Sequence, residues 1–273
     1  MSIGCFYNEN INVNFSISGS AVKFVKFLKN TQINYGVHFP FLKLEEWKNL
    51  KKHYTEKNIL FKLYEHTLCL ASHYKASYVT IHFPECMLGI SSLEAFYNSI
   101  REYASFLNEL KNRYNVPIYL EINPSTYYPF SRDFNLFISI AEEYKDLSYC
   151  LDVGAIFYNA SLLRFNAEEF IKNILSYVSS LHLSDTNMDI PQREHIPLHP
   201  IQLKDPKLWN IPKSLEYILP NLRENCIAVF EYNSLSDFPF SFVKEGISWV
   251  KSLAKGEKER LMSQKDINIF RCF

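Results

Sequence analysis

Six apolar segments of the chain each end in a side chain that can bind a metal ion or move a proton. In order along the sequence these side chains are His38, His82, Glu121, Asp152, His182 and Glu231. Imidazole and carboxylate ligands without thiolates suit Zn²⁺, Mn²⁺, Fe²⁺ or Co²⁺. One such residue at the end of a strand has little significance, but six in succession predict a shared site for one or two divalent metal ions.

The spacing of these residues predicts how the chain brings them together. Successive members are 30 to 49 residues apart, and one strand–helix–strand unit needs about 30 residues or more. The intervening segments, such as Ile59–Tyr74 and Leu93–Tyr114, repeat apolar residues at helical spacing. Alternating strands and helices imply parallel strands, because a parallel crossover needs a long connection. We therefore expect an α/β fold of the (β/α)8 TIM-barrel type, since a closed barrel lets all six strand ends converge.

The N-terminal part of this barrel can close in two ways. Ser2–Tyr7 and Ile11–Ile17 both resemble short strands, and the connection between them is too short for a parallel crossover. Either they form a hairpin, or one is a barrel strand and the other an extension. The barrel is then irregular or one unit short at its N-terminus. We expect residues 1–255 to form a single metal-dependent domain and residues 256–273 a charged tail.

Composition excludes several classes of protein. A chain of 273 residues that is 47% hydrophobic fits one barrel of about 250 residues. Its 29 basic residues balance 29 acidic ones, which argues against a nucleic-acid partner because such binding depends on neutralising phosphates. No apolar run is long enough to predict a membrane span. The six cysteines are scattered without a CxxC motif, which indicates reduced thiols and a cytoplasmic protein.

The strand ends resemble those of the xylose-isomerase-like TIM-barrel superfamily, which includes sugar isomerases and epimerases together with endonuclease IV. The segments that carry the resemblance are YGVHFPFL, VTIHFP, LEINP, LDVG, SLHLSD, VFEYN and REHIPLH. The resemblance implies that Glu121, Asp152, His182 and Glu231 match the metal-binding quartet of the ketose epimerases. In those enzymes the two glutamates also act as acid and base. Arg193 and His195, on a long loop, are then expected to contact a small sugar substrate.

The chain departs from the endonuclease IV motifs at three positions. Ala155 stands where the D-x-G-H motif has histidine, and Arg193 stands where the D-R-H-x-P-L-G loop has aspartate. His199 replaces the final glycine of that loop. The resemblance implies that the first two positions are ligands of a third zinc ion, so a three-metal site is incomplete here. A second ion could still be held by His38 and His82, with Glu121 bridging.

Three functions are consistent with these residues. The first is a divalent-metal-dependent isomerase or epimerase that acts on a small sugar or sugar phosphate through an enediolate, with Glu121 and Glu231 exchanging the proton. The second is an endonuclease IV-like phosphodiesterase that cleaves abasic sites with two metal ions. The third is a non-catalytic barrel that binds a ligand. Balanced charge and the missing third-metal ligands favour the first function, whereas His38 and His82 favour the second.

Overall fold

The computed structural model describes ten stretches of the chain, which fall into two compact units. The first unit contains Met1–Glu121 and Glu143–Leu147, and the second contains Ile122–Glu142 and Ser148–Phe273. The described residues are 2–4, 36–39, 59–82, 92–122, 124, 129–186, 195–205, 210–232, 238–256 and 268–271.

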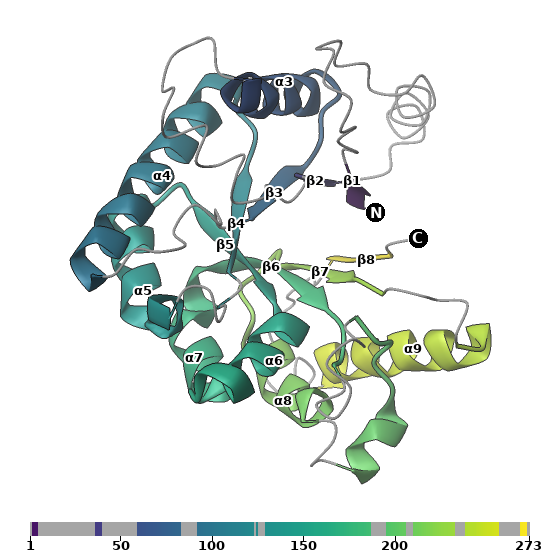
Figure 1. Cartoon of the computed structure of the whole chain (residues 1–273). Coiled ribbons are helices and arrows are strands. Elements are labelled where there is room, and N and C mark those ends of the chain that lie inside the picture. Colours follow the sequence, from purple (N-terminus) through teal and green to yellow (C-terminus); the bar gives the residue numbers. More distant parts are fainter. Residues whose placement is uncertain are drawn as a thin grey trace. The chain divides into compact units, whose positions relative to one another are not determined.

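Parallel strands and the helices between them make up the first unit (Figure 1). The strands β1 (Ser2–Gly4), β2 (Gly36–His38), β3 (Tyr78–His82) and β4 (Ile118–Ile122) pair in sequence order. Helix α3 (Ile59–His73) precedes β3, and helix α4 (Leu93–Tyr114) precedes β4. The register sets His82 opposite Glu121, so two of the predicted site residues lie side by side at the ends of neighbouring strands.

Local sequence signals explain the bounds of α4. The Ser92 hydroxyl accepts a hydrogen bond from the Ala95 amide at 3.1 Å, which caps the first turn. Asn115 ends the helix in a left-handed conformation with φ of 52°, which asparagine tolerates better than most residues. The buried side chains recur every three or four residues, as expected for an amphipathic helix. They are Phe96, Ile100, Tyr103, Ala104, Leu107 and Leu110.

The second unit repeats the same alternation. Its strands β5 (Ser148–Asp152), β6 (Val178–Leu183), β7 (Ile227–Phe230) and β8 (Asn268–Arg271) are parallel. Its α-helices are α5 (Phe134–Glu143), α6 (Val153–Leu163), α7 (Ala167–Ile174), α8 (Ile211–Ile218) and α9 (Phe240–Gly256). Short 3₁₀ helices are η2 (Pro129–Arg132), η3 (Leu175–Tyr177), η4 (Pro200–Lys204) and η5 (Leu219–Asn221). The described side chains of β7 are all buried, as in parallel sheets that helices cover on both faces.

The six predicted strand segments and the helices predicted at Ile59–Tyr74 and Leu93–Tyr114 are present. Two elements differ from the prediction. Helix α6 begins directly at Val153, in a segment for which no helix was predicted. Within the segment predicted as a charged tail, Asn268–Arg271 forms β8 and pairs with β7.

The structure describes part of the N-terminal region for which a hairpin or a barrel strand was predicted. Ser2–Gly4 pairs in parallel with β2, so the first predicted strand is a member of the sheet rather than half of an isolated hairpin. The second predicted strand, Ile11–Ile17, lies outside the described residues. No helix in the described part of the chain is long and apolar enough to cross a membrane.

Candidate functional site

In the first unit, three predicted site residues meet at the strand ends. We call His38, His82 and Glu121 the first triad; their ligand atoms all lie within 4.8 Å of one another. His38 Nε2 is 3.1 Å from one Glu121 carboxylate oxygen, and His82 Nδ1 is 3.6 Å from the other. The two imidazole rings meet edge to face, with centroids 4.7 Å apart. Glu121 is only 1% exposed, and a buried carboxylate needs a positive partner because burial is costly for a charge.

The hydrogen bond at the other ring nitrogen of His38 limits what that partner can be. His38 Nδ1 donates to the Phe39 carbonyl oxygen at 3.0 Å. In a neutral imidazole the other nitrogen, Nε2, then carries a lone pair, and this lone pair faces the Glu121 carboxylate. Two lone pairs in contact require a proton or a cation between them. A histidine fixed by a backbone carbonyl in this way has the arrangement usual for metal ligands, so the first triad fits a divalent cation.

Aromatic residues of α3 and α4 contact the strand ends that carry the first triad. The Tyr103 hydroxyl donates to the His82 carbonyl oxygen at 3.2 Å, and it lies 3.1 Å from the Tyr64 hydroxyl. The Tyr64 ring stacks on Phe39, with centroids 4.3 Å apart. Because Phe39 directly follows His38, these contacts on α3 and α4 fix the ends of both β2 and β3.

In the second unit, Asp152, His195 and Glu231 form a second triad, whose ligand atoms also lie within 4.8 Å of one another. His182 joins this group, since its Nδ1 is 3.0 Å from a Glu231 carboxylate oxygen. Asp152 and His182 are almost fully buried, whereas the Glu231 side chain is 35% exposed. Two carboxylates and one or two imidazoles are again a donor set that suits a divalent cation.

Asp152 has a structural task as well as a chemical one. Its side-chain oxygen accepts a hydrogen bond from the Ala155 amide at 2.9 Å, so it is the N-cap of α6. Gly154 lets α6 approach β6 closely, because a Cβ atom at this position would lie 2.5 Å from the Ser184 hydroxyl. That hydroxyl is 3.4 Å from His195 Nδ1. Gly154 thus leaves room for the serine that contacts His195.

The segment that carries His195 is joined to the end of β6. Asp185 and Ile196 exchange two backbone hydrogen bonds of 2.8 Å, which form an isolated antiparallel bridge. His195 has a positive φ of 57°, a left-handed backbone conformation that few residues other than glycine adopt. Such conformations persist where the surroundings fix them, and they are frequent at functional sites.

Comparisons with known proteins agree with this architecture. No protein-family model matches the sequence, and no curated protein is detectably similar to it. A D-tagatose 3-epimerase-like protein superimposes with a TM-score of 0.62 at 16% identity, over 95% of this chain and 90% of that chain. This likeness shows that the parallel strands and alternating helices of this chain share the fold of that protein.

Two further solved structures have the same fold. An L-ribulose 3-epimerase matches with a TM-score of 0.56 at 10% identity, over 96% of this chain and 87% of that chain. A xylose isomerase-like TIM barrel protein from Mycobacterium smegmatis, in complex with magnesium, matches with a TM-score of 0.55 at 13% identity, over 88% of this chain and 80% of that chain. Identities this low establish a shared fold, so the chemistry must be argued from the residues themselves.

The fold brings the predicted residues together in two groups. His38, His82 and Glu121 meet in the first unit. Glu231 meets both Asp152 and His182 in the second. His195, predicted to bind substrate, lies beside Asp152 and Glu231. Arg193 lies outside the described residues.

Sequence reasoning did not single out Asp185, although it ends the SLHLSD segment. Its side chain is fully buried, and burial raises the pKa of Asp185 to about 7, although the Thr186 amide donates to its Oδ1 atom at 2.8 Å and opposes the shift. A carboxyl group with a raised folded-state pKa binds its proton more tightly in the folded than in the unfolded chain. Its contribution to stability is therefore complete below about pH 4 and is lost as the pH rises through 7.

Replacing Asp185 with asparagine should remove this pH dependence. Between about pH 4 and pH 7, the unfolding free energy of the parent protein should include a fall of up to about 1.4 kcal/mol per pH unit due to Asp185. The Asp185→Asn variant should lack this component, because its amide does not titrate. Urea unfolding of both metal-free proteins at several pH values measures the difference. Parallel pH profiles for the two proteins would contradict the assignment.

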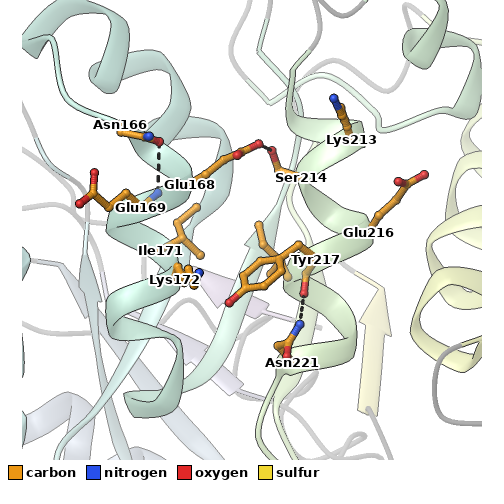
Figure 2. A pocket seen from close by; sticks show the side chains of 11 residues that line it. Asn166, Glu168, Glu169, Ile171, Lys172, Lys213, Ser214, Glu216, Tyr217 and Asn221 are labelled. Atoms are coloured by element: carbon orange, nitrogen blue, oxygen red, sulfur yellow. Dashed lines mark hydrogen bonds between the residues drawn. The ribbon is translucent and has the colours of Figure 1, made fainter. Parts of the chain in front are cut away.

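A surface groove of about 710 Å³ lies between α7 and α8, and its lining contains none of the predicted site residues. Figure 2 shows the Ser214 hydroxyl, which donates to Glu168 at 2.7 Å, and Lys172, whose Nζ atom is 6.0 Å from the centroid of the Tyr217 ring. The lining carries the acidic residues Glu168, Glu169 and Glu216 and the basic residues Lys172 and Lys213, so neither sign of charge dominates. We therefore assign no function to it.

Proposed function

We propose that this chain is a divalent-metal-dependent isomerase or epimerase that acts on a small sugar or sugar phosphate. The observation that supports this most directly is the contact between each glutamate and a histidine nitrogen. Glu121 lies 3.1 Å from His38, and Glu231 lies 3.0 Å from His182. Carboxylates held in this way can bind a cation and exchange a proton with a carbon atom beside a carbonyl group.

In this proposal each residue has a defined role. His38, His82 and Glu121 hold one divalent ion, and Asp152, His182 and Glu231, together with His195, provide for a second or alternative ion. A bound zinc, manganese, cobalt or iron ion would supply positive charge that stabilises negative charge on substrate oxygens. Glu121 and Glu231 remove and return the proton at their carboxylate oxygens, and Arg193 contacts the substrate. Glu231 is the more accessible of the two glutamates, since Glu121 is almost fully buried.

The proposal includes the domain organisation of the chain and its location in the cell. We infer a single barrel domain, which β8 extends beyond residue 255. The cysteines within the described stretches, Cys69, Cys150 and Cys226, are free thiols, which supports a reducing, cytoplasmic environment.

A second candidate, a phosphodiesterase of the endonuclease IV kind, is favoured by one specific observation. The first and second triads are each a complete three-residue ligand set. Two ion sites are what a two-metal displacement at phosphorus requires. An epimerase needs only one.

Proton exchange in heavy water distinguishes these functions. We expect the protein, loaded with Mn²⁺, Co²⁺, Zn²⁺ or Mg²⁺, to exchange the hydrogen beside the carbonyl group of at least one ketose or ketose phosphate for deuterium. Proton nuclear magnetic resonance of a panel of sugars measures this, and elemental analysis counts the ions per chain. Cleavage of an oligonucleotide with an abasic site, with two tight ions per chain, would support the phosphodiesterase. Absence of both activities in a metal-loaded protein would support a non-catalytic barrel.

A further inference from the structure

Residues 195–205 carry His195 and are attached to the second unit at two places. The first attachment is the backbone bridge between Ile196 and Asp185 at the end of β6. The second is the packing of His199, four residues after His195, against α9. His195 itself has a left-handed backbone conformation, with φ of 57°, so contacts on either side must hold it in place.

His199 makes the contacts of the second attachment. Its ring stacks on Phe242 of α9, with centroids 3.9 Å apart and planes 10° from parallel. Its Nδ1 atom accepts a hydrogen bond from the Ile201 amide at 3.1 Å, which caps η4. The ring proton therefore lies on Nε2, which is 3.3 Å from a Glu245 carboxylate oxygen. Although it is a histidine, His199 is only 7% exposed.

The backbone around His199 is fixed from two further directions. The His199 amide donates to the Gln202 side-chain oxygen at 2.6 Å, and the Gln202 amide group donates to the Pro197 carbonyl oxygen at 3.2 Å. On α9, Gly246 allows the loop to lie directly against the helix. A Cβ atom at this position would be 1.8 Å from the Leu198 carbonyl oxygen, which is backbone and can move only if the whole segment moves. We call His199, Phe242, Glu245 and Gly246 the latch.

We infer that His199 is a positioning residue, which fixes residues 196–199 on α9 and thereby holds His195 against Asp152 and Glu231. This inference rests on the proposed function, because it assigns His195 to the metal-binding group. His199 stands where the resembling loop motif has glycine. A glycine at this position would have no ring to stack on Phe242.

The test uses His199→Asn and Gly246→Ala in the full-length protein. Asparagine is a favourable N-cap residue and should keep the hydrogen bond to Ile201, but it loses the stack on Phe242 and the approach to Glu245. Gly246→Ala disturbs the same attachment from the α9 side and leaves His199 unchanged. Lys204→Ala, at an exposed residue of the same 3₁₀ helix, is the control.

Two measurements separate this inference from the proposed function. In metal-free protein, hydrogen exchange at the Ile196 amide should be at least about tenfold faster in both latch variants than in the parent or in Lys204→Ala, because the bridge to Asp185 opens more often. In titrations with Zn²⁺ alone, the latch variants should bind about tenfold to a hundredfold more weakly, as expected when support for a ligand is lost. Protein that bound no zinc would overturn the proposed metal site, while the exchange measurement would still decide the latch.

A double substitution shows whether His199 acts through His195. His195→Ala alone should weaken zinc binding, and adding His199→Asn should then cause no further loss beyond about twofold, because the residue to be positioned is absent. Unchanged exchange at Ile196 in both latch variants would overturn the inference. So would a full additional loss of zinc affinity in the His195→Ala background, which would show that His199 acts by another route.

Discussion

Glu121→Gln is expected to reduce turnover by about a thousandfold or more while the protein remains folded. Glutamine matches glutamate in size but is a poor metal ligand and cannot accept the proton. In the metal-free protein its amide group can donate to His38 Nε2, which now faces a carboxylate at 3.1 Å. The substitution therefore satisfies the lone pair of His38 with a hydrogen bond and should not lower the thermal midpoint.

Metal content, turnover and thermal unfolding of Glu121→Gln should be measured beside Glu109→Gln. Glu109 is an exposed residue of α4 whose carboxylate contacts Arg113 at 2.7 Å, and its replacement should change none of the three quantities by more than a small amount. Activity of Glu121→Gln within about threefold of the parent would remove Glu121 from the reaction. Unchanged metal content would remove the first triad as a metal site.

The prediction of the strand ends succeeded for a physical reason. Buried parallel strands are nearly continuous apolar runs, so a histidine or carboxylate at the end of such a run stands out in the sequence. Glu121 follows Ile118–Leu120 in this way, and His82 follows Tyr78–Ile81. The parallel arrangement predicted that these strand ends share one edge of the sheet, and the observed register sets His82 opposite Glu121.

The features that could not be predicted depend on contacts distant in sequence. Helix α6 is apolar around most of its surface and begins at Val153, directly after β5, so it lacks the amphipathic pattern that identified α4. The four residues of β8 follow a charged stretch, and their strand is specified by pairing with β7. The position of His195 depends on its positive φ and on the bridge between Asp185 and Ile196. Nothing in the local sequence encodes either one.

Asp152 combines two roles that substitution can separate. Its Oδ1 atom caps α6 by accepting from the Ala155 amide at 2.9 Å, and its carboxylate is a potential ligand beside His195 and Glu231. Asparagine caps helices about as well as aspartate does, whereas alanine does not. Asp152→Asn therefore removes the charge alone, and Asp152→Ala removes both the charge and the cap.

Both Asp152 variants should lose about a hundredfold or more in affinity for a divalent ion, because a charged oxygen ligand is gone. Only Asp152→Ala should also lower the unfolding free energy of the metal-free protein, by about 1 kcal/mol. The matched control is Asn166→Ala, which removes the N-cap of α7, a hydrogen bond of 3.1 Å from the Glu169 amide. It should reduce stability by a similar amount and leave metal affinity unchanged. Denaturant unfolding and Zn²⁺ titration of the three variants test the separation. If Asp152→Asn bound zinc as tightly as the parent, Asp152 would be a helix cap alone, and the second triad would have to be rebuilt around His182 and Glu231.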